Sequence, residues 1–252
     1  MRFLRIVAVA AILNAMAVPA PSGSPAAITV WTTRAIATVL AEIGGDFERE
    51  TGHKLVVTSD LPPAFARRAR EGQPFDLLIT GSAPLDEWIK EGRILAATRT
   101  DIARSGIGVE VRAGAPRPDI SSVETFKRAL LDAKSIAYLQ VGSGIYIHGL
   151  VDKLGVANAI KAKVTRPDTD IVSELVANGE IELGMTVITQ ILTTPGVDLA
   201  GPLPAEIQFY VTFTAGVGAR SLAPDAAQQL IRFLRSPRAV AIIKAQGMEP
   251  LS

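Results

Sequence analysis

Hydroxyl groups and one cation follow the apolar runs in the first third of this sequence. The positions are Thr32, Thr33 and Arg34 after "AITVW", Ser59 after "KLVVT", and Ser82 after "FDLLIT". Hydroxyl and main-chain N–H groups can hold an anion when they converge on it, and arginine adds a bidentate donor for carboxylates. Serine and threonine are also favoured helix N-caps, so each position alone has a purely structural explanation. Together they predict an anion site.

The second half of the chain repeats this arrangement at two places. "QVGSGIYIHG" contains Ser143, Gly144, Ile145 and Tyr146, and "MTVITQ" contains Thr186. Glycine serves turns with positive φ, and it also lets a ligand approach bare backbone. We therefore include these five residues among the candidate ligand-binding residues.

Groups suited to covalent or metal chemistry are scarce. The chain has no Cys and two His, and no acidic cluster has a metal-binding spacing. It has no G-x-S-x-G elbow and no phosphate-binding loop. His148 and Asp60 are the candidate bases. The sequence thus predicts a binding protein without metal or cofactor, with an enzyme as the alternative.

The elements that position these residues alternate along the chain. The first part predicts strands at 27–31, 51–59 and 75–80, each followed by a helix at 35–50, 62–72 and 84–94. The second part predicts strands at 135–139 and 181–187 and helices at 121–133, 146–154 and 169–178. Ser121 or Ser122 is expected to cap the first of these helices, with Glu124 as capping-box partner. Two further helices end the chain, broken at Ser236-Pro237.

Extended runs at 105–114 and 207–219 are predicted to connect two lobes. The expected fold is α/β, with mixed, mostly parallel sheets flanked by helices and two crossing strands as the hinge. We expect one lobe at 27–108 plus 212–252 and the other at 109–211. Because ligands bind beyond the carboxyl ends of strands in such sheets, the candidate residues should meet between the lobes.

The N-terminus predicts export. Arg2 and Arg5 precede an apolar run at 6–18, and small residues and prolines follow it. This order is typical of a signal peptide, here placed at 1–26, and it predicts a periplasmic protein. The net charge of +1 argues against nucleic acid as a partner. We expect a monomer that binds a small anion.

The segments "VWTTRAIATVLAEIGGDFERETGHKLVVTS", "GQPFDLLITGSAPLDEWIKEGRI" and "VANGEIELGMTVITQI" resemble the periplasmic molybdate-binding proteins of ABC importers. The resemblance runs from Ile28 to the closing "GMEP" and implies a type II periplasmic binding protein that docks on an ABC transporter permease in the membrane. Carried over by residue, the family's ligand contacts fall on Thr32, Thr33, Ser59, 141–146 and Thr186.

This chain departs from the family pattern at three places. It has Thr32, Thr33 and Arg34 where the family has small residues, a proline-containing second loop at 59–63, and Thr186 where the family has tyrosine. Arg34 would favour a planar carboxylate if it faced the cleft, whereas it would be a solvated side chain if it pointed away. The implied ligand is therefore either a small organic carboxylate or a molybdate-like oxyanion.

Overall fold

The first sheet is built from three β-strand–α-helix units. The computed structural model describes residues 25–251, so most of the predicted signal peptide lies outside the described residues. The units contain β1 (Ala27–Thr32), α1 (Arg34–Thr51), β2 (Lys54–Ser59), α2 (Pro62–Arg70), β3 (Leu77–Gly81) and α3 (Ser82–Lys90). Strand β1 pairs in parallel with both β2 and β3, which confirms the predicted alternation.

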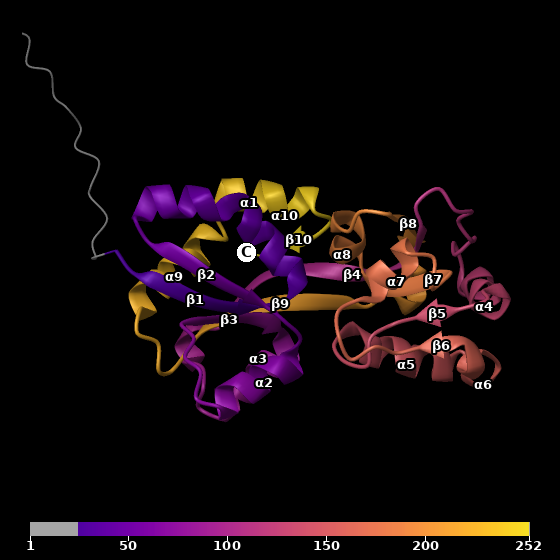
Figure 1. Cartoon of the computed structure of the whole chain (residues 1–252), viewed down its shortest axis with the longest axis horizontal. Helices are drawn as coiled ribbons and strands as arrows, with labels where there is room; N and C mark the ends of the chain where they lie inside the picture. The colour runs from indigo at the N-terminus through magenta and orange to yellow at the C-terminus, as the bar shows by residue number, and fades with distance from the viewer. Residues whose placement is uncertain (1–24, 252) are drawn as a thin grey trace, which may run out of the picture.

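Strand β4 (Thr100–Arg112) is long enough to belong to both sheets. Its first half pairs antiparallel with β9 (Tyr210–Val217), and its second half pairs with β7 (Leu183–Val187) and β8 (Val197–Pro202). Strand β9 in turn pairs with β3. Figure 1 shows β4 and β9 side by side where the two parts of the molecule join.

The second sheet has the order β4-β7-β5-β6, and β8 pairs with β4. Its elements are α4 (Val123–Asp132), β5 (Ile136–Ala137), α5 (Ser143–Lys153), α6 (Ala157–Ile160), β6 (Val164–Thr165), α7 (Val172–Ala177), β7, α8 (Ile188–Thr193) and β8. The end of the chain returns to the first sheet through α9 (Pro224–Phe233), α10 (Pro237–Ala245) and β10 (Glu249–Pro250), which pairs with β4. Short 3₁₀ helices lie at Ala96–Thr98, Lys161–Lys163 and Ala205–Ile207.

Each sheet has its own hydrophobic core. One cluster joins β1, β3 and β9 to α1, α9 and α10, and the other joins β4 and β7 to α4 and α5. We call the part around the first sheet lobe 1 and the part around the second sheet lobe 2. The exact boundaries at 108/109 and 211/212 stay a prediction. Helix α1 buries Ile36, Val39 and Phe47 against the first sheet, as its apolar spacing predicted.

An aromatic cluster fills the other face of the first sheet. The rings of Trp31 and Phe75 stack with centroids 4.7 Å apart, and Trp31 also stacks on Phe65. Trp88 of α3 meets Trp31 edge to face at 6.5 Å. Both tryptophans therefore pack in the core of lobe 1, and this packing fixes α2 and α3 on the sheet.

The helix caps and helix ends differ more from the sequence-based predictions than the order of the elements does. Ser122 does cap α4, but its capping-box partner is Thr125 and not Glu124. Helix α5 begins at Ser143, three residues earlier than predicted, and α7 spans only Val172–Ala177. Within residues 25–251, no helix combines the length and apolarity that crossing a membrane requires.

Candidate functional site

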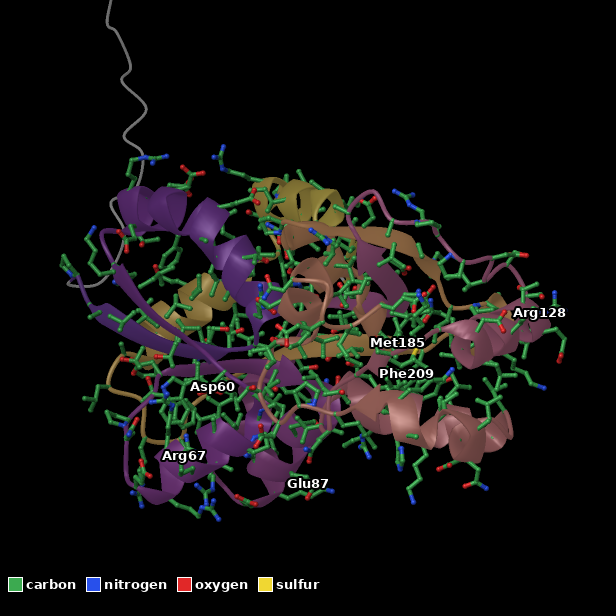
Figure 2. The ribbon with its side chains drawn as sticks, turned by 45° about the vertical axis from the view of Figure 1, so that its right-hand side comes forward. Asp60, Arg67, Glu87, Arg128, Met185 and Phe209 are labelled. Atoms are coloured by element: carbon green, nitrogen blue, oxygen red, sulfur yellow. The ribbon has the colours of Figure 1, made fainter. Side chains whose placement is uncertain are left out.

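A cavity of about 360 Å³ lies between the lobes. Lobe 1 contributes the starts of α1, α2 and α3 together with β9, and lobe 2 contributes the start of α5, the loop before α7, and the end of β7 with α8. In Figure 2, Asp60 and Arg67 lie on the lobe 1 side, while Phe209 and Met185 lie toward lobe 2. Phe209 is one of the apolar residues of the cavity wall. The cavity is thus polar at helix ends and apolar between them.

Four helices of nine residues or more begin at the cavity without a side-chain cap. One of them, α2, starts with Pro62 and Pro63, which have no N–H group. The N-cap residues of the other three are Thr33 of α1, Gly81 of α3 and Gly142 of α5. By contrast, Ser122 and Ser236 do cap α4 and α10, whose starts do not line the cavity. The first N–H groups of a helix lack intrahelical partners and carry a partial positive charge. The three uncapped ends therefore present donors to an anion in the cavity.

Two buried hydroxyl groups in the wall have no hydrogen-bond partner within the described residues. They are Oγ1 of Thr33, after β1, and Oγ1 of Thr80, near the end of β3. The backbone N–H of Thr33 is already used, since it donates to Ile79 O at 3.3 Å. An unpaired buried hydroxyl costs free energy. A ligand in the cavity would recover that cost by accepting from both groups.

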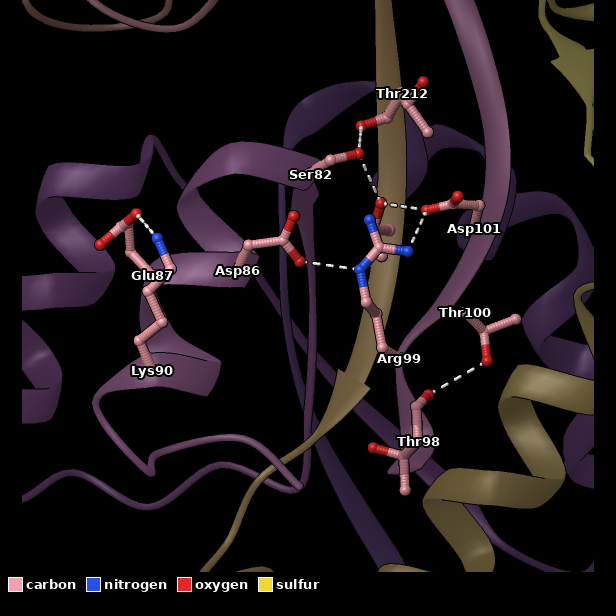
Figure 3. Close-up of polar contacts among 10 residues, drawn as sticks. Ser82, Asp86, Glu87, Lys90, Thr98, Arg99, Thr100, Asp101 and Thr212 are labelled. Carbon is pink, nitrogen blue, oxygen red and sulfur yellow. Dashed lines mark hydrogen bonds and ion pairs between the residues drawn. The ribbon is translucent and has the colours of Figure 1, made fainter. Parts of the chain in front are cut away.

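Ser82 has its hydroxyl group engaged (Figure 3). Its Oγ lies 2.8 Å from Thr214 Oγ1 and 3.3 Å from Thr212 O. Thr214 Oγ1 donates its own proton to Asp101 at 2.6 Å. The proton of Ser82 therefore goes to one of the two threonine oxygens. The Ser82 oxygen can therefore only accept a hydrogen bond from a ligand. Its predicted role as a donor to an anion does not fit this geometry.

Lobe 2 contributes a chain of three polar side chains. Thr186 Oγ1 donates to Gln190 Oε1 at 3.4 Å, and Gln190 Nε2 donates to Asp170 Oδ1 at 2.6 Å. All three residues line the cavity. Burial raises the pKa of Asp170, against the opposing effect of its hydrogen bond from Gln190. This series of hydrogen bonds thus ends at the carboxyl group of Asp170, whose ionised form is disfavoured by burial.

Arg34 faces the cleft and crosses it. Its Nη1 lies 2.5 Å from Glu174 Oε1 and also donates to Asp170 O at 3.3 Å, and its Nη2 donates to Thr194 Oγ1 at 3.4 Å. Arg34 belongs to α1, and its three partners belong to lobe 2. The guanidinium therefore joins the lobes, and Glu174 offsets its charge.

A second carboxyl group lies behind this pair. Glu110 of β4 is fully buried, accepts from Ser173 Oγ at 3.1 Å, and leaves its Oε2 without a partner among the described residues. Burial raises the pKa of Glu110 to about 7, although the hydrogen bond from Ser173 opposes the rise. A second acidic side chain whose ionised form is disfavoured by burial thus lies on the lobe 2 side.

The structure brings half of the predicted site residues to the cavity. Those that line it are Thr33, Arg34, Ser82, Ser143 and Thr186. Those that do not line it are Thr32, Ser59, Gly144, Ile145 and Tyr146.

The five residues away from the cavity have other environments. Thr32 is buried within β1, and Ser59 is exposed at the end of the edge strand β2. Ile145 points to solvent with 64% of its surface exposed. Tyr146 stacks on Phe209 with ring centroids 4.5 Å apart. These environments assign the four residues packing or surface positions.

Gly144 has a steric role beside the cavity. A Cβ atom on this residue would lie 1.7 Å from the backbone oxygen of Leu139. Leu139 itself lines the cavity. Glycine at 144 therefore lets α5 pack directly against the cavity wall.

Sequence reasoning missed Thr80, Asp170 and Gln190. Thr80 ends the run "FDLLIT" and Gln190 ends "MTVITQ", so both lie in segments that the sequence indicates, next to the predicted Ser82 and Thr186. Asp170 lies in a loop whose place over the cavity depends on tertiary packing. The candidate bases Asp60 and His148 are not among the lining residues. Asp60 accepts from the N–H of Leu61, and His148 pairs with Tyr138.

Comparison with known proteins places this chain in a family. The family described as bacterial extracellular solute-binding protein matches residues 28–249. The chain belongs to that family. Aconitate isomerase from a Pseudomonas species is 29% identical over 230 residues, which cover 89% of this chain and 88% of that protein. Molybdate-binding protein ModA of Azotobacter vinelandii is 24% identical over 219 residues, covering 82% of this chain and 84% of that protein.

The fold agrees with this assignment. The periplasmic molybdate-binding protein of Azotobacter vinelandii superposes with a TM-score of 0.74 at 20% identity, covering 89% of this solute-binding protein and 100% of that chain. The predicted type II periplasmic binding protein fold and the resemblance to molybdate-binding proteins are therefore confirmed.

Proposed function

We propose that this solute-binding protein captures a small organic carboxylate between its lobes and delivers it to the permease of an ABC importer. The observation that carries the proposal is the cavity between the lobes, where three uncapped helix ends and two unpaired hydroxyls converge. Such a nest of neutral donors holds an anion without a full counter-charge. The family match supports a location outside the cytoplasmic membrane, and the N-terminal sequence is the basis for proposing the periplasm.

The size of the cavity favours an organic acid over a tetrahedral oxyanion. Its volume of about 360 Å³ equals roughly twelve water molecules at ~30 Å³ each. An oxyanion with five heavy atoms would leave more than half of that space to water. A carbon skeleton would instead contact apolar wall residues such as Leu61, Val187 and Phe213. The relative named aconitate isomerase supports a polycarboxylate.

A thermal-shift screen followed by calorimetry tests this proposal. The panel contains molybdate, sulfate, acetate, succinate, citrate, and cis- and trans-aconitate at equal concentration and ionic strength. A ligand that binds only the native state, at a free concentration of 100 times its Kd, adds about 2.7 kcal/mol to the free energy of unfolding. We expect di- or tricarboxylates to raise Tm and molybdate to leave it unchanged. A shift with molybdate alone would assign the oxyanion, and no shift with any anion would overturn the proposal.

We propose isomerisation of an unsaturated polycarboxylate as the second candidate function, because a relative 29% identical over 230 residues is named aconitate isomerase. Shifting a double bond requires a group that removes a proton from carbon. Asp170 is the one carboxyl group that lines the cavity in the described part of the chain. Incubation with trans-aconitate in D₂O, followed by proton NMR, tests for cis-aconitate and for deuterium at carbon. If trans-aconitate binds but neither cis-aconitate nor deuterated product forms, the isomerase function is excluded and the receptor function remains.

A further inference from the structure

Asp170 places an acidic side chain in a cavity otherwise equipped for an anion. It lines the wall opposite the uncapped starts of α1 and α3. An ionised carboxylate there would repel a carboxylate ligand, and the repulsion is strong where water is excluded. The receptor function proposed above therefore raises the question of how this site accepts its ligand.

Hydrogen bonds within lobe 2 make the conflict sharper. Thr186 gives its proton to Gln190, and Gln190 gives an amide proton to Asp170 Oδ1. The Thr186 hydroxyl proton and one of the two Gln190 amide protons are thus used within the protein. Within residues 25–251, Asp170 Oδ2 has no hydrogen-bond donor, so it remains an acceptor.

Asp170 shares its neighbouring positive charge with other acidic groups. Arg34 of α1 donates to the main-chain oxygen of Asp170 and pairs with Glu174 of α7. Glu110 of β4 adds a further acidic group on the same side, and Gln190 of α8 is neutral. Burial raises the pKa of Asp170, and Glu174 adds to the rise, while the hydrogen bond from Gln190 and the charge of Arg34 oppose it without cancelling it. A bound anion acts in the same direction.

We propose that Asp170 takes up a proton when the cavity binds its carboxylate ligand, and that the protonated carboxyl then donates a hydrogen bond to the ligand. The proton comes from solvent and binds Oδ2, the ligand carboxylate accepts from it, and Oδ1 keeps its hydrogen bond from Gln190. Asp170 then makes ligand binding depend on pH. It also favours ligands that have a hydrogen-bond acceptor at this end of the cavity. This inference rests on the proposed receptor function.

Isothermal titration calorimetry in pairs of buffers with different ionisation enthalpies measures the proton uptake. The probes are citrate and tricarballylate, which share three carboxylates and differ by one hydroxyl. Wild type is compared with Asp170→Asn at pH 6, 7 and 8, and Asp168→Asn is the matched control because Asp168 is exposed and does not line the cavity. The protonation of the ligand is common to all variants and cancels. The Tm of each variant verifies folding.

We expect wild type and Asp168→Asn to take up as much as about one proton more than Asp170→Asn with both probes. Their affinity should fall up to about tenfold per pH unit above the pKa of Asp170. Asp170→Asn should lack this dependence and bind more tightly than wild type at pH 8, because its amide donates without a proton.

Three results would overturn the inference. Equal uptake by wild type and Asp170→Asn would exclude Asp170 as the proton acceptor. Citrate binding without uptake, together with weak tricarballylate binding, would show that a ligand hydroxyl supplies the donor. Both results leave the receptor function intact. Binding of neither these probes nor any carboxylate in the thermal-shift screen would overturn the receptor function as well.

Discussion

Arg34 and Glu174 join the two lobes through an ion pair, with 2.5 Å between Nη1 and Oε1. Arg34 begins α1 in lobe 1, and Glu174 lies on α7 in lobe 2. Both side chains line or border the cleft, with exposed fractions of 28% and 41%. The protein's own charges thus connect the two lobes, in addition to any contacts that a bound ligand makes.

Replacing Glu174 by Gln should open the unliganded protein. Exposed ion pairs contribute about 0.2–1 kcal/mol, which corresponds to a change of up to about fivefold in the ratio of closed to open molecules. Small-angle X-ray scattering should record a larger radius of gyration for Glu174→Gln without ligand. Glu180→Gln, at an exposed position just after α7, is the control and should match wild type. An unchanged radius for Glu174→Gln would show that the ion pair does not hold the lobes together.

Thr80→Val should separate ligand binding from stability. Valine keeps the shape of threonine and removes a hydroxyl that is buried without a partner among the described residues. The free protein should therefore be equally stable or more stable, by up to about 1 kcal/mol, whereas the affinity for a carboxylate should fall about tenfold or more because a charge-assisted hydrogen bond is lost. Chemical unfolding and calorimetry measure the two effects.

The control for this variant is Thr58→Val on β2, which does not line the cavity. It should leave the affinity unchanged. Loss of stability in Thr80→Val with an unchanged Kd would assign Thr80 a structural role instead.

Two glycines of α5 should respond in opposite ways to alanine. A Cβ at position 144 would meet the backbone of Leu139 at 1.7 Å, and backbone cannot move aside. Gly144→Ala should therefore destabilise the protein by more than about 2 kcal/mol. At Gly149 nothing lies within 4 Å of the added atom, so Gly149→Ala should be neutral or stabilise by up to about 1 kcal/mol through helix propensity. Similar Tm values for the two variants would contradict this packing.

Glu110 should make folding stability depend on pH. The pKa of Glu110 is about 7 in the folded protein, against 4.5 for an unperturbed glutamate. The native state then holds more protons than the unfolded state between these values. Stability therefore falls as pH rises from about 4.5 through 7, by up to about 3 kcal/mol in total. Ser173, which donates to Glu110, limits this loss.

Glu110→Gln mimics the protonated side chain. It should be more stable than wild type at pH 8 and close to wild type at pH 4.5, as urea unfolding at the two pH values would measure. The measurement compares how the free energy of unfolding changes between pH 5 and 8 in wild type and in Glu110→Gln. The same change in both proteins would rule out this titration.

The order of the elements could be predicted from sequence because apolar spacing and chain order determine it locally. Helix α1, for example, was expected at 35–50 and spans Arg34–Thr51. The identity of the cavity residues depended on which side of a junction faces the other lobe. Ser59 and Thr80 both lie at strand ends, yet only Thr80 lines the cavity. No local sequence pattern indicated that the loop before α7 would bring Asp170 to the cavity.

The aromatic cluster of lobe 1 has a consequence for spectroscopy. Trp31 and Trp88 are the only two tryptophans of the chain, and their rings are 6.5 Å apart. Intrinsic fluorescence therefore samples a single environment and carries no direct signal of the distance between lobes. Trp31 is two residues from Thr33 in the cavity wall, so a change in emission on adding an anion would report a local disturbance at the start of α1.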